Sequence, residues 1–191
     1  MRISIGNDHR GVQFKLKLAD LLKRLGHEVV DAGTNESSAI DYPDVAAIVA
    51  KQVAGQDSDR GILICGTGIG MAIAANKVPG IRATTCHDEV TAEICRRHNN
   101  VNVLCLSADL VGEQLIQRLV EVWAQYRLRW WTPRTPDQKD RKTRVEWLRR
   151  VHRLSPLRLS GKRNAKFSSD RLDSSCVDFE YWKPNFCQLG F

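Results

Sequence analysis

A cysteine and three closely spaced glycines in the middle of the chain are the residues best suited to chemistry. The apolar run 61–65 ends in Cys65, and Gly66, Gly68 and Gly70 follow at once. A buried strand that turns through glycines into a helix presents backbone N–H groups to an anion. A thiol beside a helix N-terminus has a lowered pKa, so Cys65 could act as a nucleophile or a base. Both features also have a structural explanation, because glycines permit tight strand–helix packing and cysteine is often a small core residue.

The glycine loop differs from two well-known phosphate-binding motifs. No Gly-Lys-Ser/Thr follows at the spacing of a Walker A loop. The pattern is Gly-x-Gly-x-Gly, and it follows the third predicted strand, whereas a dinucleotide fingerprint follows the first. We therefore interpret the loop as a cradle for a phosphate or an enolate.

Other polar residues stand at the predicted ends of strands and helices, and each has two interpretations. Asp8 and His9 follow the first predicted strand, where they could belong to a site or form a helix cap and a surface histidine. His98 ends a predicted helix, where a protonated imidazole would also favour the negative end of the helix dipole. Tyr42 lies in a polar loop and is explained most simply as a loop anchor.

Alternating strands and helices are expected to position these residues. Strands are predicted at 2–6, 28–31, 60–65, 81–85 and 102–106, and helices at 12–25, 44–54, from the glycine loop to about 76, 89–98 and 112–125. Gly26 is the predicted stop of the first helix. This order predicts an α/β fold, flavodoxin-like (Rossmann-like), with a five-stranded parallel sheet between two helix layers. Ligands bind at the carboxyl ends of such strands, where residues 8–9, 65–70, 86–87 and 107–109 fall.

Charge divides the chain near residue 126. Residues 1–126 hold 13 Lys and Arg against 15 Asp and Glu, a net charge of −2, whereas residues 127–191 hold 16 against 7, a net charge of +9. We predict one domain over 1–126 and an atypical basic tail over 127–191, disordered or frame-shifted. The alternative, a nucleic-acid-binding extension, is less favoured because the tail has no sustained helical or strand period.

Composition also limits the setting of the protein. No run of about 18 apolar residues is present, so no membrane span is expected. The N-terminal stretch is too short and too strand-like for a signal peptide. The six scattered cysteines form no Cys-x-x-Cys pair, which favours reduced thiols in a cytoplasmic protein over a disulfide framework or a metal site. Three of them are interpreted as core residues: Cys86, Cys95 and Cys105.

Several linked motifs resemble the ribose-5-phosphate isomerase B family, which includes galactose-6-phosphate and allose-6-phosphate isomerases. They fall between Met1 and about Gln125, at 6–11, 41–43, 61–77, 80–83 and 98–104. The resemblance implies interconversion of an aldose phosphate and a ketose phosphate through a cis-enediolate, without a metal or cofactor. It also implies a homodimer or homotetramer with sites at subunit interfaces. Ribose 5-phosphate of the pentose phosphate pathway is the favoured substrate, and allose or galactose 6-phosphate is the alternative.

The resemblance assigns a role to each candidate residue. Cys65 would be the base that moves a proton between C1 and C2, and His98 would assist ring opening with Thr67 nearby. Backbone N–H groups of the loop would stabilise the enediolate oxygen, at Gly66, Gly68, Ile69 and Gly70. Four side chains would hold hydroxyls or phosphate: Asp8, His9, Tyr42 and Asn99. These roles suit the reaction, which needs a base tuned near neutral pH and fixed donors at the developing oxyanion.

The chain departs from the family pattern at two places. Asp109 stands where many members have an arginine, and the phosphate-gripping Gly-Gly-Arg-His-x-x-Arg is replaced by a stretch containing Trp130-Trp131-Thr132. Tryptophan has the single codon TGG and threonine codons begin AC, so these residues read one base forward give GGT-GGA, Gly-Gly. Permitted third bases then continue to Arg-His-Ala-Arg-Arg. We hypothesise that the chain from about residue 127 is a frame-shifted translation, which would leave a catalytically impaired remnant as a further alternative. Resequencing across codons 120–135 tests this, and a clean read in the present frame would contradict it.

Overall fold

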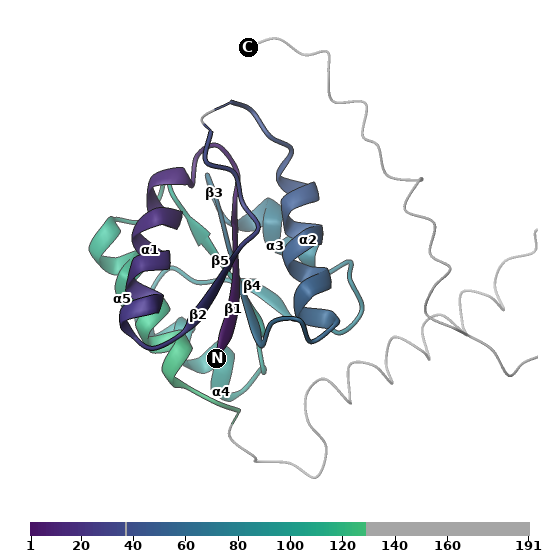
Figure 1. Cartoon of the computed structure of the whole chain (residues 1–191). Helices are drawn as coiled ribbons and strands as arrows, with labels where there is room; N and C mark the ends of the chain where they lie inside the picture. The colour runs from purple at the N-terminus through teal and green to yellow at the C-terminus, as the bar shows by residue number, and fades with distance from the viewer. Residues whose placement is uncertain (37, 129–191) are drawn as a thin grey trace, which may run out of the picture. The chain divides into compact units, whose positions relative to one another are not determined.

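The computed structural model describes residues 1–36 and 38–128, so nearly all of the predicted tail lies outside the described residues. Strands and helices alternate along the described chain (Figure 1). The strands are β1 Arg2–Asn7, β2 Glu28–Asp31, β3 Arg60–Cys65, β4 Ala83–Thr85 and β5 Val103–Ser107. The helices are α1 Val12–Arg24, α2 Tyr42–Ala54, α3 Ile69–Ala75, α4 Glu89–Arg97 and α5 Glu113–Gln125. None of these helices has the length and apolar character needed to cross a lipid bilayer.

The strands form one parallel sheet in the order β2-β1-β3-β5-β4. Asn7 pairs with Ile64, and Cys65 pairs with Ser107, so β1, β3 and β5 end at the same edge. The parallel sheet and its helix layers confirm the predicted α/β class. The last two strands are exchanged relative to the 2-1-3-4-5 order of flavodoxin itself, a detail that the order of elements along the chain does not specify.

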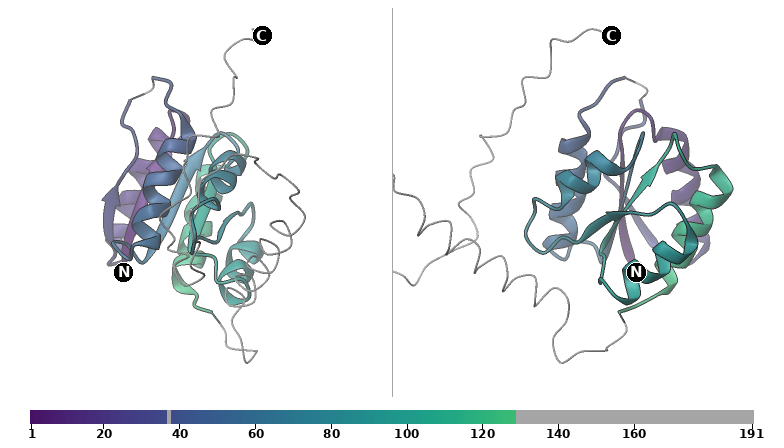
Figure 2. Two further views of the ribbon diagram at one scale, coloured as in Figure 1. Left: turned by 90° about the vertical axis from the view of Figure 1, so that its right-hand side faces the viewer. Right: turned by 180° about the vertical axis from the view of Figure 1, so that it is seen from behind.

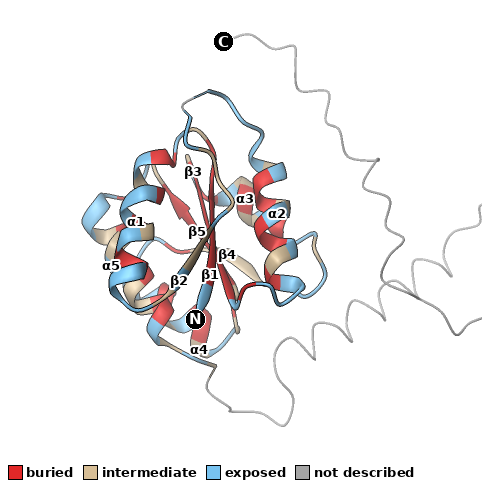
Figure 3. Ribbon diagram, in the orientation of Figure 1, coloured by how far each residue is buried: buried red, intermediate tan, exposed pale blue. Residues whose placement is uncertain are grey.

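Two helix layers cover the two faces of the sheet. Helices α1, α4 and α5 lie on one face, and α2 and α3 lie on the other (Figures 1 and 2). Along β3, Ile62 and Ile64 pack into the first core, whereas Leu63 and Cys65 pack into the second. Successive side chains of a strand point to opposite faces, so a strand buried on both sides must be a continuous apolar run. Figure 3 shows that β1, β3 and β5 are buried along most of their length, whereas β2 and β4 at the two sides of the sheet are not.

The end of α1 follows the prediction made from Gly26. Gly26 has φ +80°, in the left-handed region that glycine adopts without strain. Its N–H donates to the carbonyl of Lys23 at 3.0 Å, and the N–H of His27 donates to the carbonyl of Leu22 at 2.9 Å. This pair of bonds is the Schellman arrangement, which satisfies carbonyls at a helix end.

Two elements begin two residues away from the predicted positions, and several other boundaries differ by one residue. Helix α2 begins at Tyr42, two residues early, because a proline in the first helical turn lacks only an N–H that would have no partner there. Tyr42 is therefore a helical residue and not part of the loop. Strand β4 begins at Ala83, two residues late. At this point the amide side chain of Asn76 bonds both the N–H and the C=O of Ala83, at 2.9 and 2.8 Å.

Candidate active site

Cys65 ends the central strand and lies under the glycine loop. The residue is 5% exposed, and its Sγ accepts a hydrogen bond from the N–H of Gly68 at 3.1 Å. Gly68 has φ +77°, a left-handed conformation that turns this N–H back toward the sulfur. The strand, the thiol and the turn thus stand in the arrangement expected from the sequence. This contact places a backbone hydrogen-bond donor on the sulfur.

Some N–H groups of the glycine loop bond nearby side chains, and others have no acceptor among the described residues. The N–H of Gly68 is engaged by Cys65, and the N–H of Ile69 donates to Thr67 Oγ1 at 3.3 Å. Within residues 1–36 and 38–128, no acceptor takes a hydrogen bond from the N–H of Thr67 or Gly70. The N–H of Gly66 likewise has no acceptor among the described residues, so Gly66, Thr67 and Gly70 are the loop donors open to an oxygen of a ligand.

Tyr42 lies directly against the glycine loop. A Cβ placed on Gly70 would lie 2.7 Å from Cε2 of Tyr42 and 3.2 Å from its hydroxyl oxygen. The ring therefore occupies the space that any other side chain at position 70 would need. Tyr42 and the glycine loop are far apart in the sequence, and the fold places them in contact within one chain. Sequence spacing did not predict this contact.

Asp8 and His9 lie at the same edge of the sheet as Cys65. The N–H of Asp8 donates to the carbonyl of Ile64 at 3.0 Å, which ties the end of β1 to the end of β3. A carboxylate oxygen of Asp8 accepts from the N–H of Arg10 at 2.9 Å, so this side chain also caps the turn. The Nδ1 atom of His9 is buried and has no hydrogen-bond partner among the described residues.

An ion pair that the sequence did not reveal borders the loop. Both Nε and Nη2 of Arg10 donate to Oδ1 of Asp109, at 3.1 and 2.7 Å. The other carboxylate oxygen of Asp109 lies 2.8 Å from the position of a Cβ on Gly66. The hydrogen bond and charge of Asp109 raise the pKa of Arg10. The carboxylate thus covers the first residue of the loop, and Arg10 holds it there.

His98 and Asn99 lie at the opposite edge of the sheet from Cys65. Helix α4 runs back from the carboxyl end of β4 to the amino end of β5, and His98 is its C-cap. The five residues of β5 separate the two edges by about 13 Å. One chain therefore does not bring His98 or Asn99 to Cys65, nor His98 to Thr67.

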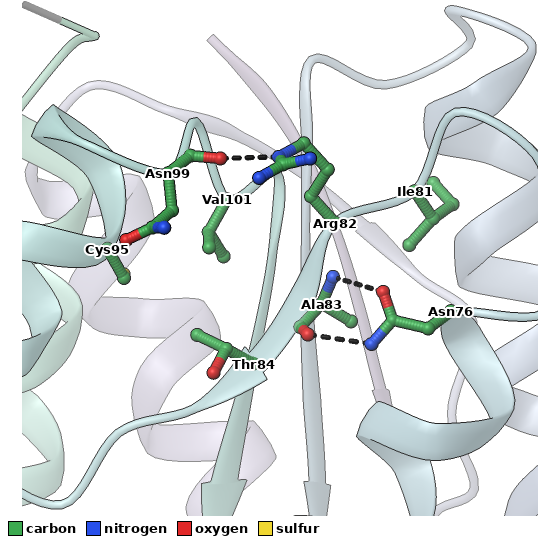
Figure 4. A pocket seen from close by; sticks show the side chains of 8 residues that line it. All are labelled: Asn76, Ile81, Arg82, Ala83, Thr84, Cys95, Asn99 and Val101. Atoms are coloured by element: carbon green, nitrogen blue, oxygen red, sulfur yellow. Dashed lines mark hydrogen bonds between the residues drawn. The ribbon is translucent and has the colours of Figure 1, made fainter. Parts of the chain in front are cut away.

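Asn99 instead borders a hollow of about 480 Å³ at this opposite edge (Figure 4). Its carbonyl accepts a hydrogen bond from Nε of Arg82, and Thr84 and Val101 line the same hollow. Figure 4 shows Asn99 and Arg82 facing each other, joined by this hydrogen bond, next to the start of β4. The polar groups of this hollow belong to a different part of the surface from the glycine loop.

The remaining described cysteines are buried free thiols, as their interpretation as core residues predicted. Cys86 and Cys95 place their sulfur atoms 3.8 Å apart between β4 and α4. Burial raises the pKa of the Cys105 thiol well above its ordinary value. In the described part of the chain, no three side chains of His, Cys, Asp or Glu gather as ligands of a metal ion would.

Comparison with known proteins supplies a family for this arrangement. Residues 3–145 match the sequence profile of the Ribose/Galactose Isomerase family. The chain is 46% identical to ribose-5-phosphate isomerase B of Escherichia coli (strain K12) over 127 residues, 65% of this chain and 85% of that protein. It is 38% identical to the galactose-6-phosphate isomerase subunit LacB of Clostridium acetobutylicum over 125 residues, 65% of this chain and 72% of that one. The structure of Clostridium thermocellum ribose-5-phosphate isomerase B superposes with a TM-score of 0.68 at 40% identity, covering 80% of this chain and 98% of the other.

Proposed function

Since this chain belongs to the ribose/galactose isomerase family of sugar-phosphate isomerases, we propose that it interconverts ribose 5-phosphate and ribulose 5-phosphate. The observation that carries the proposal is the Cys65 sulfur at the end of β3, 3.1 Å from the Gly68 N–H. Identity of 46% to a relative named for ribose 5-phosphate, against 38% to one named for galactose 6-phosphate, favours the five-carbon substrate. Free thiols at the described cysteines are in keeping with a cytoplasmic enzyme.

The proposed reaction needs one base and one set of fixed donors. The Cys65 thiolate removes the proton from C2 of the open-chain aldose, and the electron pair forms the C1–C2 double bond of a cis-enediolate. As this double bond forms, the carbonyl electron pair moves onto O1. The hydroxyl proton then passes from O2 to O1, and return of the carbon-bound proton from Cys65 to C1 restores a carbonyl at C2 and gives the ketose. The N–H of Gly68 stabilises the thiolate, and the N–H groups of Thr67 and Gly70 are the donors for the enediolate oxygen.

We further propose that His98 and Asn99 reach Cys65 from a second copy of the chain. They lie at the wrong edge of the sheet to serve their own Cys65, whereas a two-fold axis can bring each edge to the other copy. On α3, beside the glycine loop, Ile69 and Ile73 are 52% and 53% exposed and share one helix face. On α4, Ile94 is 45% exposed, one turn before His98. Covering these apolar side chains in a homodimer would remove them from water.

Turnover of ribose 5-phosphate tests the assignment of Cys65. Cys65→Ala is expected to lower kcat by at least about 100-fold, the usual contribution of a positioned base. Cys105→Ala is the matched control, because it removes a buried thiol of the neighbouring strand that no loop N–H contacts. Full activity in Cys65→Ala would refute the base assignment. A higher kcat/KM for allose or galactose 6-phosphate than for ribose 5-phosphate would refute the substrate assignment.

Subunit complementation tests the shared site. Cys65→Ala and His98→Ala, each inactive alone, are co-expressed with different affinity tags. A mixed dimer then holds one site with both residues intact. Random pairing makes half of the dimers mixed, so about a quarter of the wild-type activity should return. No recovery in purified mixed dimers would show that His98 does not serve the partner's Cys65.

A catalytically impaired sugar-phosphate-binding protein is the second candidate. The observation that favours it is the Asp109 carboxylate above Gly66, where it faces any anion approaching the loop. The substituted stretch 129–135, outside the described residues, is a further reason. A variant whose tail is restored to Gly-Gly-Arg-His-Ala-Arg-Arg decides between the two. Activity that appears only in the restored variant supports the impaired remnant, and equal activity of both chains supports the enzyme.

A further inference from the structure

We propose that Arg10 binds the phosphate group of the substrate and that Asp109 holds the Arg10 side chain in place until phosphate replaces it. We call this exchangeable ion pair the Arg10–Asp109 latch. The identity of the anion rests on the proposed function. Arg10 belongs to the turn after β1 and Asp109 to the turn after β5, and β3 with Cys65 ends between them. The latch therefore spans the mouth of the glycine loop.

While it is paired with Asp109, Arg10 keeps a hydrogen-bond donor available for a ligand. Asp109 accepts through a single oxygen, Oδ1, from Nε and Nη2. No other described residue accepts a hydrogen bond from Nη1. A guanidinium binds phosphate oxygens in a bidentate fork, so a phosphate can take the edge that Asp109 holds and add a bond to Nη1.

Arg10 offsets the negative charge of side chains beside the glycine loop. A phosphate monoester carries nearly two negative charges at neutral pH. Asp8 and Asp109 are acidic side chains beside the glycine loop. The guanidinium of Arg10 bonds Asp109, and the backbone N–H of Arg10 bonds Asp8. If Arg10 were absent, the Asp109 carboxylate would meet the incoming phosphate with an uncompensated like charge directly above Gly66.

Both side chains of the latch are exposed to water, which allows a phosphate to replace Asp109 as the partner of Arg10. The side chains of Arg10 and Asp109 are 55% and 38% exposed, and an ion pair this open to water is weak. A doubly charged phosphate can displace a singly charged carboxylate from such a pair. Once released, Asp109 can turn into solvent. The adjacent His9, with its buried and unpartnered Nδ1, offers a further polar atom on the same turn.

Isothermal titration of ribose 5-phosphate, and of inorganic phosphate, into the full chain tests the latch without requiring turnover. Arg10→Ala should weaken both affinities by roughly 10- to 100-fold, the range for a lost hydrogen bond to a charged group. Asp109→Asn should tighten both by up to about fivefold, because it frees Arg10 from a surface ion pair. Arg118→Ala is the matched control, a surface arginine paired with Glu121 on α5, and should change neither.

Each result has a defined meaning. An affinity in Arg10→Ala within twofold of wild type, or weaker binding in Asp109→Asn, would overturn the latch. Absence of any phosphate binding by the wild-type chain would overturn it as well. Parallel turnover assays keep the two proposals separate: a chain that binds ribose 5-phosphate but isomerises no sugar phosphate refutes the proposed function, while the Arg10→Ala comparison still decides the latch.

Discussion

Gly68→Ala should destabilise the protein more than a left-handed glycine elsewhere. Gly68 has φ +77°, and a Cβ there would lie 3.1 Å from Cγ2 of Thr85 and 3.2 Å from the backbone of Leu106. The left-handed conformation costs a non-glycine residue about 1–2 kcal/mol. Crowding adds about 1–3 kcal/mol, because Leu106 belongs to β5, which is held between β3 and β4 and cannot move aside. The expected loss is about 2–5 kcal/mol in the free energy of unfolding.

The chain offers a matched control for this substitution. Gly26 has φ +80°, yet a Cβ there would meet nothing within 4 Å. Gly26→Ala should therefore lose only the conformational part, about 1–2 kcal/mol. Urea unfolding followed by circular dichroism measures both variants under the same conditions. The difference between them isolates the crowding against Thr85 and Leu106.

The same substitution tests the contact with Cys65. Moving the Gly68 N–H away from Sγ removes a donor that stabilises the thiolate, so kcat should fall at temperatures where the variant remains folded. Gly26→Ala, distant from the loop in the sequence and placed at the end of α1, should keep its kcat. Equal losses of stability in the two variants would refute the crowding argument. An unchanged kcat in folded Gly68→Ala would refute the role of the N–H.

Three further predictions concern the scaffold. In urea unfolding, Asp31→Asn should lower the free energy of unfolding by about 3 kcal/mol and Lys15→Met by only about 1 kcal/mol. The Lys15 side chain is 1% exposed and the Asp31 side chain 46%, so only Asp31→Asn leaves a buried charge without its partner. A larger loss in Lys15→Met would contradict this. Burial lowers the pKa of His27, so as pH falls below about 6.5 the unfolded chain binds a proton at His27 before the folded chain does, and stability declines. His27→Gln should make stability fall less steeply between about pH 7.5 and 5.5. The same slope in both proteins would exclude His27 as the cause. Asn76→Asp keeps the acceptor for the N–H of Ala83 but removes the donor to its C=O, so it should cost about 1 kcal/mol, and no loss would show that this pair does not hold β4.

Local sequence patterns were sufficient for most of the fold. The apolar run ending at Cys65 predicted a strand buried on both faces, and Gly26 predicted the end of α1; both are confirmed. Such signals depend on residues a few positions apart, and the spacing of apolar residues and glycines records them directly. The start of α2 was wrong by two residues because Tyr42-Pro43 suits either a loop or a first helical turn.

The assembly of the candidate site depended on contacts that sequence spacing does not encode. Motifs alone identified Cys65, the glycine loop and the acidic residue at 109. Arg10 and Asp109 are 99 positions apart and meet because β1, β3 and β5 are neighbours in the sheet. His98 falls at the opposite edge because α4 must run back before β5 can lie parallel to β4. The sequence by itself therefore determined which groups this protein has for chemistry, while the strand order and the return of each crossover helix decided which of them one chain can bring together.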